Sequence, residues 1–246
     1  MSESYFEAYG SLAEAGLTPT QLAGRYGSQA RAERLIGADV EKKLGLTPDT
    51  TLLEIGCGPG NLLLPLSFRV AQATGLDHPR IVEKARLRFA DARVHWIGGE
   101  FPNVKLEPGQ DRFDAILIYS VMHYVADMES ALAFCDAATR LLAPGGRMLI
   151  GDMPNVDRKR RFLASDAGIA FDAEWRRSQA AHTTPKPGGD PFEIFNGCKS
   201  IGGFTDVDLL RLLAHFRARG LHAYLLAQPA DLPFGHTRED ILVVKP

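Results

Sequence analysis

The chain has 246 residues, 45% of them hydrophobic and 24% charged, which is typical of a soluble globular protein and ample for one large α/β domain. Its 28 Lys and Arg nearly balance 30 Asp and Glu, so we expect no nucleic-acid partner, since nucleic-acid-binding proteins usually carry a basic excess. The three cysteines lack the paired spacing of a metal site, so no metal is expected. Without a secretory leader pattern or a long apolar run, we expect a cytoplasmic protein with no membrane partner.

Residues 1–45 carry the signals of several helices. Thr18 followed by Pro19 has the form of an N-cap with proline at the first helical position. Further on, apolar residues recur at helical spacing, namely Ala32, Leu35, Ile36, Val40 and Leu44. We therefore predict an N-terminal helical segment over 1–45.

From residue 46 onward, strand-like and helix-like patterns alternate. The expected strands are short apolar runs at 50–56, 73–77, 93–99, 113–120, 147–152, 221–227 and 240–245. The expected helices lie between them, at 62–72, 79–90, 128–143 and 207–220. Thr205 and Asp208 have the spacing of a capping box for the last of these helices. Such alternation favours a doubly wound, Rossmann-like, mostly parallel seven-stranded sheet with an antiparallel final strand and helices on both faces.

Residues 153–204 interrupt this alternation with a charged run at 157–161 and a Pro/Gly-rich stretch at 183–191. The segment is too long for an ordinary connection, and long connections are often functional. It follows the strand 147–152, at the edge of the sheet where open α/β folds bind ligands. We predict that 153–204 is a substrate lid, acting with the N-terminal helices, and that 46–152 and 205–246 form the core.

The stretch LLEIGCGPGN, residues 52–61, places Gly56, Gly58 and Gly60 directly after the first core strand. Glycines there allow a tight turn and let a ligand lie against bare backbone. Dinucleotide-binding enzymes use G-x-G-x-x-G, but Asn61 follows the third glycine here and the spacing is G-x-G-x-G. A nicotinamide-dependent oxidoreductase is therefore disfavoured.

Several motifs together resemble the class I S-adenosylmethionine-dependent methyltransferases of small-molecule type. They are LLEIGCGPGN, TGLD ending at Asp77, FDAILIYSVMHYV, and LLAPGGRMLIGD. The resemblance covers roughly residues 31–152 and 205–245. It implies S-adenosylmethionine as the cofactor, bound along the glycine loop that includes Gly56, Cys57, Gly58 and Gly60. Cys57 is expected to be a small filler of that loop and not a nucleophile.

The same resemblance implies roles for acidic residues near the glycine loop. Asp77 would accept hydrogen bonds from the ribose hydroxyls, and the alternative is a turn-forming aspartate before Pro79. Glu54 would face the amino-acid end of the cofactor. Glu100 is a substitute candidate for the adenine contact, because many relatives carry aspartate after this strand. His78 stands where relatives place an apolar side chain on adenine; a turn histidine is an equal alternative.

The stretch 119–124, YSVMHY, follows the strand expected beside the transferred methyl group. It lacks the Asn/Asp-Pro-Pro-aromatic tetrapeptide of related enzymes that methylate DNA amines and protein amides. Ser120 is assigned to the cofactor site. His123 is the candidate catalytic base, although a packing histidine is favoured over a base. Asp127 and Asp152 are weaker candidates.

Basic residues of the insertion could meet an anionic acceptor, such as a nucleotide-linked sugar or carrier phosphate. They are Arg158, Lys159, Arg160, Arg161, Arg176 and Arg177. A solvated helix face is the favoured alternative, as for most charge runs. The aromatic residues Phe171, Trp175 and Phe192 are expected to pack the lid.

The sequence thus predicts methyl transfer from S-adenosylmethionine to a hydroxyl or amine of a small molecule, a sugar or secondary metabolite. Two alternatives stay open: a protein or RNA methyltransferase, and a protein that binds S-adenosylmethionine without turnover. The oligomeric state is left open.

Overall fold

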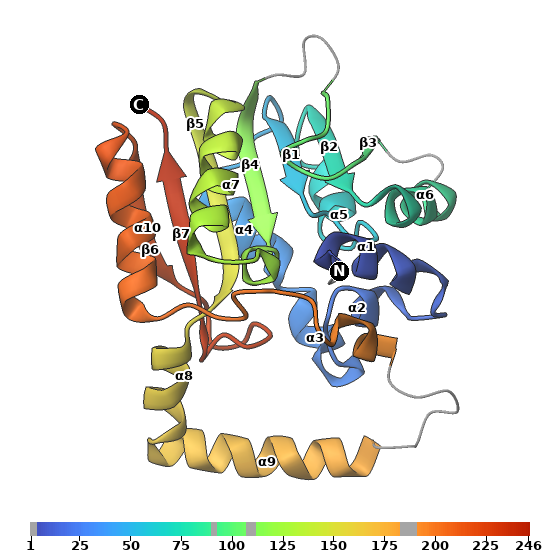
Figure 1. Cartoon of the computed structure of the whole chain (residues 1–246), viewed down its shortest axis with the longest axis vertical. Helices are drawn as coiled ribbons and strands as arrows, with labels where there is room; N and C mark the ends of the chain where they lie inside the picture. Colours follow the sequence, from blue (N-terminus) through green and yellow to red (C-terminus); the bar gives the residue numbers. More distant parts are fainter. Residues whose placement is uncertain (1–3, 90–92, 107–111, 183–190) are drawn as a thin grey trace.

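The computed structural model describes residues 4–89, 93–106, 112–182 and 191–246, which form a central sheet with helices on both faces (Figure 1). Seven strands lie in the order β3-β2-β1-β4-β5-β7-β6. They are β1 (Thr51–Ile55), β2 (Gln72–Asp77), β3 (Val94–Gly98), β4 (Phe113–Tyr119), β5 (Leu142–Pro154), β6 (His222–Ala227) and β7 (Arg238–Val244). β7 is antiparallel to β5 and β6, and the other neighbours are parallel. The predicted doubly wound sheet is confirmed.

The central strands are buried on both faces. Ile116 and Leu117 on β4 are fully buried, as are Leu149 and Ile150 on β5. Successive side chains of a strand point to opposite faces of the sheet, so both faces must be covered. This explains why these strands are almost continuous apolar runs in the sequence.

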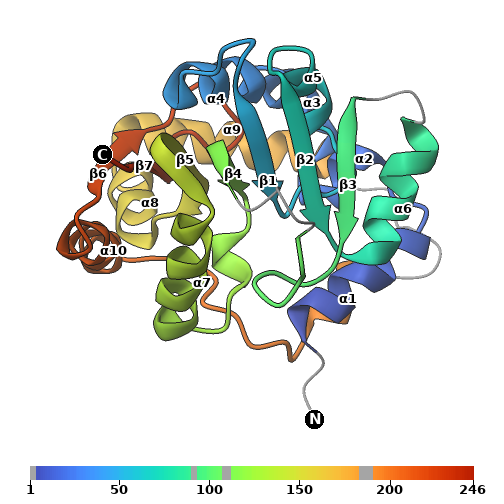
Figure 2. The ribbon, with the colours of Figure 1, turned by 90° about the horizontal axis from the view of Figure 1, so that it is seen from above.

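Two groups of helices supply the cover (Figure 2). The first group is α4 (Ile36–Leu44), α5 (Leu63–Ser67) and α6 (Pro79–Arg88), most of whose buried apolar residues join one core cluster. The second group is α7 (Met128–Arg140) and α10 (Asp206–Ala218), whose buried residues join a different cluster. The capping box predicted for α10 is present, with Thr205 and Asp208 exchanging hydrogen bonds.

Two of the predicted helices end well before their expected last residue. The helix expected over 62–72 ends at Ser67, because the chain must turn to reach the register in which Gln72 pairs with Thr51. The helix expected over 128–143 ends at Arg140, because Leu142 already pairs with Phe113 in the sheet. Both helices end early because neighbouring residues are used in strand pairing.

The N-terminal segment folds into short helices, as predicted. They are α1 (Tyr5–Ser11), η1 (Leu12–Glu14), α2 (Pro19–Leu22), η2 (Gly27–Gln29) and α3 (Ala30–Glu33). Thr18 caps α2, with its side chain accepting from the Gln21 N–H and Pro19 at the first helical position. These helices lie at the edge of the sheet where β1 and β2 end (Figures 1 and 2).

The insertion divides into two parts. α8 (Val156–Leu163) and α9 (Asp166–His182) extend away from the sheet, whereas η4 (Pro191–Phe195) lies beside the N-terminal helices (Figure 1). Phe192, Ile194 and Phe195 pack against a small core that includes Leu12 and Leu22. The Pro/Gly stretch at 183–190 lies outside the described residues. The division of the chain into core and lid stays a prediction.

Within the described ranges, no helix combines the length and the apolar character that crossing a membrane requires. The predicted cytoplasmic location stays a prediction.

Candidate functional site

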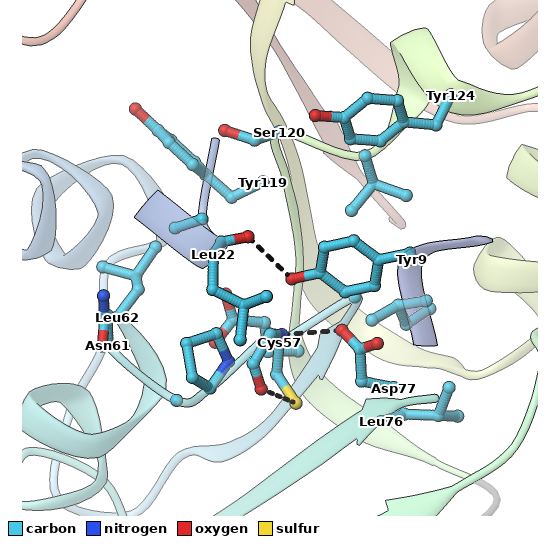
Figure 3. A pocket seen from close by; sticks show the side chains of 18 of the residues that line it. Tyr9, Leu22, Cys57, Asn61, Leu62, Leu76, Asp77, Tyr119, Ser120 and Tyr124 are labelled. Carbon is cyan, nitrogen blue, oxygen red and sulfur yellow. Dashed lines mark hydrogen bonds between the residues drawn. The ribbon is translucent and has the colours of Figure 1, made fainter. Parts of the chain in front are cut away.

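A cavity of about 1280 Å³ opens at the carboxyl ends of the parallel strands. Its floor includes the loop after β1, the end of β2 and the segment after β4, and the N-terminal helices cover it. In Figure 3, Tyr9 lies between two walls, with Cys57 and Asp77 on one side and Tyr119, Ser120 and Tyr124 on the other. Open α/β sheets bind their ligands at this edge, where the strand order reverses.

The three loop glycines hold backbone conformations that other residues rarely adopt. Gly56, Gly58 and Gly60 have φ of 77°, 53° and 83°. A Cβ on Gly56 would lie 2.4 Å from a methyl carbon of Val121, and one on Gly60 would lie 2.6 Å from the Trp96 ring. The loop therefore needs glycine for its turn and for the close approach of neighbouring side chains.

Asp77 fastens this loop to the end of β2. Its carboxylate accepts hydrogen bonds from the Gly58 N–H at 2.7 Å and from the His78 N–H at 2.6 Å. The side chain lines the cavity and is 7% exposed. Burial raises its pKa to about 6, although the two N–H donors oppose this shift. Each oxygen keeps a lone pair for a further donor, such as a ligand hydroxyl.

Glu54 places a second carboxylate in the cavity wall. It is 3% exposed, and its Oε2 has no hydrogen-bond partner among the described residues. Burial and the nearby Asp77 carboxylate raise its pKa well above the usual range. A buried carboxylate without a partner is costly, so the site favours a ligand that brings a cation or a donor. The ammonium group of S-adenosylmethionine fits this requirement.

The remaining predicted cofactor residues divide between the cavity and its surroundings. Cys57, Glu100 and Ser120 line it, with Glu100 exposed. His78 is buried but is not among the lining residues. Its ring packs under α1, with Phe6 at 4.7 Å between ring centroids, and its Nδ1 accepts from the Arg80 N–H at the start of α6.

His123, the candidate base, lies behind the cavity wall. It is not among the lining residues, and its ring packs 4.0 Å from the Tyr124 ring. Burial lowers its pKa to about 3, with Arg238 and Arg25 adding to the shift. Its Nδ1 has no hydrogen-bond partner in the described part of the chain. The ring is therefore neutral near pH 7, and this placement matches a packing histidine better than a base.

Several cavity residues were missed in the sequence, mostly in the N-terminal segment. Tyr5 and Tyr9 reach the cavity from α1, and the Tyr9 hydroxyl donates to the Leu22 carbonyl at 3.1 Å. Arg25 is 9% exposed, and its Nη2 donates to Ser120 Oγ at 3.0 Å. Tyr5 and Tyr9 are four residues apart on one helix face, a spacing that could have indicated their shared role. Arg25 carries no comparable signal.

Five of the six basic residues named above in the insertion form ion pairs away from the cavity. Arg158 contacts Glu239 at 3.3 Å and Arg161 contacts Asp206 at 2.5 Å. Arg160 pairs with Asp157, Arg176 with Asp172, and Arg177 with Glu174. Among the described residues of 153–204, Lys199 alone lines the cavity. This arrangement agrees with the solvated helix face favoured above.

The aromatic residues of the insertion contact other rings. Phe171 lies against Phe162, with 5.7 Å between ring centroids, and Trp175 lies against Tyr26 at 5.2 Å. Phe192 lies 6.2 Å from Phe195, which in turn stacks on Tyr5 at 4.2 Å. η4 thereby joins the N-terminal helices over the cavity.

Residues 52–146 match the family model of a methyltransferase domain. Similar proteins include the demethylmenaquinone methyltransferase of Tropheryma whipplei, 34% identical over 124 residues, which are 50% of this chain and 48% of that protein. The ubiquinone biosynthesis O-methyltransferase of Methylobacterium nodulans is 36% identical over 144 residues, 58% of this chain and 55% of that protein. The chain spans about half the length of the curated relatives it matches.

Solved structures share the fold over nearly the whole chain. The N-methyltransferase NodS from Bradyrhizobium japonicum in complex with S-adenosyl-l-homocysteine superposes with a TM-score of 0.60 at 17% identity, covering 99% of this chain and 100% of that chain. The magnesium protoporphyrin IX methyltransferase from Synechocystis with bound SAM gives 0.57 at 13% identity, covering 100% and 93%. At such low identities the likeness concerns the fold alone.

Proposed function

This chain belongs to the class I S-adenosylmethionine-dependent methyltransferases, and we propose that it transfers the methyl group of S-adenosylmethionine to a small molecule. One observation carries the proposal. Three features that suit this cofactor line one covered cavity: the glycine loop, the Asp77 carboxylate and the unpartnered Glu54 carboxylate. A cavity for a dinucleotide would instead need a pyrophosphate site, which the glycine spacing disfavours.

Each feature would hold a different part of the cofactor. Asp77 would accept hydrogen bonds from the ribose hydroxyls, and Glu54 would pair with the ammonium group. Gly56 and Gly58 expose backbone beside both carboxylates, so the sugar and the sulfonium can lie against the main chain. The apolar ring of Phe101, which lines the cavity beside Glu100, offers a surface for adenine.

The cavity also leaves space for an acceptor. Its volume of about 1280 Å³ exceeds the range of about 300–1000 Å³ that is usual for one small ligand. The side chains of Tyr5, Tyr119 and Tyr124 line the part beyond the glycine loop. The N-terminal helices that cover the cavity would exclude water and orient the acceptor. Because the sulfonium already activates the methyl group, orientation of the acceptor is the main task of the enzyme in this reaction.

A small-molecule acceptor agrees with two further observations. Two of the relatives are named as a demethylmenaquinone methyltransferase and a ubiquinone biosynthesis O-methyltransferase. The net charge of −2 offers no attraction to RNA. Methylation of a protein or RNA is the second candidate, and a binding protein without turnover is the third.

Calorimetric titration with S-adenosylmethionine and S-adenosylhomocysteine tests the cofactor site directly. Asp77→Ala is expected to weaken binding by about 1.5–3 kcal/mol, the cost of losing charged hydrogen bonds. The matched control is Asp136→Ala, which removes a half-buried carboxylate that pairs with His215 on α10, outside the cavity lining, and should leave the affinity unchanged. Unchanged affinity of the Asp77 variant, or preferential binding of NAD, would contradict the proposal. A screen for S-adenosylhomocysteine release with small-molecule acceptors then separates an enzyme from a binding protein.

A further inference from the structure

The carboxyl ends of β4 and β5 share an unusual backbone conformation. Ser120 directly follows β4, and Asp152 lies near the end of β5, where the pairing with β7 shifts register, and both have φ of 59°. Left-handed backbone is unfavourable for residues other than glycine and is often kept where function requires it. Neighbouring groups hold both residues in place: the Ser120 N–H donates to the Gly151 carbonyl at 3.1 Å, and the Asp152 N–H donates to Asp240 Oδ1 at 2.9 Å.

This conformation brings the two side chains into contact. The Ser120 hydroxyl donates to Asp152 Oδ2 at 2.5 Å. Asp152 is 4% exposed, and its Oδ1 has no hydrogen-bond partner among the described residues. The guanidinium groups of Arg25 and Arg238 lie 3.9 and 3.7 Å from the carboxylate, close enough to stabilise its charge but beyond hydrogen-bond distance. The carboxylate thus retains capacity to take up a proton.

Ser120 connects this buried carboxylate to the cavity. Its side chain lines the cavity, whereas Asp152 lies behind it. A hydroxyl offers one donor and two acceptor positions. The donor is used for Asp152 and one acceptor position for Arg25 Nη2 at 3.0 Å, so one position is left for a donor from the cavity. In Figure 3, Ser120 and Tyr124 lie on the same wall, across Tyr9 from Asp77.

We propose that Ser120 and Asp152 form a proton relay that deprotonates the hydroxyl of an aromatic acceptor, so that the methylated atom is oxygen. The proposal rests on the methyltransferase function proposed above. The acceptor hydroxyl donates to Ser120 Oγ; its proton moves to Ser120 as the Ser120 proton moves to Asp152 Oδ2. The acceptor oxygen takes the methyl group from the sulfonium, whose sulfur keeps the bonding electron pair. A positive sulfonium and a negative carboxylate end as a neutral thioether and a neutral carboxylic acid.

The chemistry of the relay favours an aromatic hydroxyl over other acceptors. A neutral amine can be methylated before it loses a proton, so it would not need the relay. An aliphatic alcohol is too weak an acid for a carboxylate to deprotonate, whereas a phenol has a pKa near 10, as in tyrosine. The cavity wall also suits a ring, because Tyr5, Tyr124 and Phe134 line it.

The test uses two probe acceptors that differ in hydroxyl acidity, catechol and the much more acidic 4-nitrocatechol. General-base assistance is typically worth about 100-fold or more, so Asp152→Asn should lower kcat with catechol by about 100-fold. With 4-nitrocatechol, which ionises without help, the loss should be under about fivefold, because little assistance is left to remove. In Asp152→Asn, the asparagine tolerates the left-handed backbone and can still accept a hydrogen bond from Ser120. The second variant, Ser120→Gly, removes the hydroxyl without backbone strain.

The spectrum of 4-nitrocatechol gives a readout that does not depend on turnover. Bound to the complex with S-adenosylhomocysteine, below the pKa of the free probe, it should show more of the ionised form than in solution. Asp152→Asn should abolish this excess. Control variants are Asp136→Asn, an aspartate outside the cavity wall, and His123→Ala, which should affect both probes by the same factor.

Equal losses with both probes in Asp152→Asn would overturn the relay and leave Asp152 a packing residue. Failure of the wild-type protein to methylate either probe would overturn the aromatic hydroxyl acceptor. Calorimetry with S-adenosylmethionine on the same samples separates these results from failure of the proposed function. If the wild-type protein binds S-adenosylmethionine, only the relay proposal is contradicted. If it does not bind S-adenosylmethionine, both proposals are contradicted.

Discussion

The two ends of the cavity are built from different parts of the protein chain. At the cofactor end, one continuous segment, the end of β1 and the glycine loop at 54–60, supplies backbone and one carboxylate, and Asp77 fastens it from the adjacent strand. At the acceptor end, side chains meet from segments far apart: Arg25 and Ser120 are 95 residues apart, and Ser120 and Asp152 are 32 apart. The cofactor end is a local structure, and the acceptor end depends on tertiary packing.

This difference separates what is common to the family from what is particular to this chain. A loop with glycine at every second position presents bare backbone, which suits a nucleoside whatever the acceptor is. The acceptor end depends on the short helices α1 to α3 and on the loops after β4 and β5, whose residues can change without disturbing the sheet. Substrate choice is therefore expected to lie with residues such as Tyr5, Arg25 and Tyr124.

The largest expected effect comes from adding one carbon to the cofactor end. Gly56→Ala should abolish cofactor binding and destabilise the fold by about 2–5 kcal/mol, the sum of left-handed strain of about 1–2 kcal/mol and overpacking of about 1–3 kcal/mol. The added Cβ would lie 2.4 Å from Val121. Urea unfolding and calorimetry measure the two effects.

Gly145→Ala is the matched control for that substitution. Gly145 has the same φ of 77°, but no atom lies within 4 Å of the position of its added Cβ. Only the strain of about 1–2 kcal/mol should remain, with cofactor affinity unchanged. If the two variants lost the same stability and affinity, crowding by Val121 would not be the reason for glycine at position 56.

A change of pH is expected to have a smaller effect on ligand affinity at the cofactor end of the cavity. The pKa of Asp77 is raised to about 6, and its ionised form is the one that would accept from both ribose hydroxyls in the proposed complex. Affinity for S-adenosylhomocysteine should therefore be constant above this value and fall as the pH drops through it, by about tenfold at one pH unit below. Calorimetry across this pH range measures the change.

Asp77→Asn separates Asp77 from Glu54 in that experiment. Asparagine does not titrate, so the step near the pKa of Asp77 should disappear. Any pH dependence that persists in this variant belongs to Glu54, whose pKa is also raised. A full step in the variant would mean that Asp77 does not control the affinity.

The smallest effect is expected in the insertion. Arg161→Ala removes an exposed ion pair with Asp206 outside the cavity wall, so turnover with catechol should match the wild-type protein. Arg25→Ala, in contrast, should reduce turnover, because Arg25 donates to Ser120 and is buried. If Arg161→Ala and Arg25→Ala reduced turnover to a similar extent, the basic residues of α8 would belong to the acceptor site.

The sequence predicted the sheet and the cofactor end because both are encoded by short-range patterns. Buried parallel strands are apolar runs, and the loop 56–60 shows its glycines directly. It did not predict that Arg25 and Ser120 would meet, because no spacing rule relates residues joined only through packing. His78 and His123 were singled out by residue type and position, yet the structure places both rings outside the cavity wall. Side-chain direction depends on neighbours that a single sequence does not place.

The stacking of Tyr5 has a consequence for how ligands enter and leave. Its ring lies between those of Tyr124 and Phe195, with 4.4 and 4.2 Å between centroids. One side chain thus joins the first helix, the loop after β4 and the end of the insertion. Movement of the Tyr5 ring would break both stacking contacts at once. We therefore expect α1, the loop after β4 and η4 to separate together when the cavity opens. Displacement of the Tyr5 side chain would then set the rate at which S-adenosylhomocysteine leaves and S-adenosylmethionine binds.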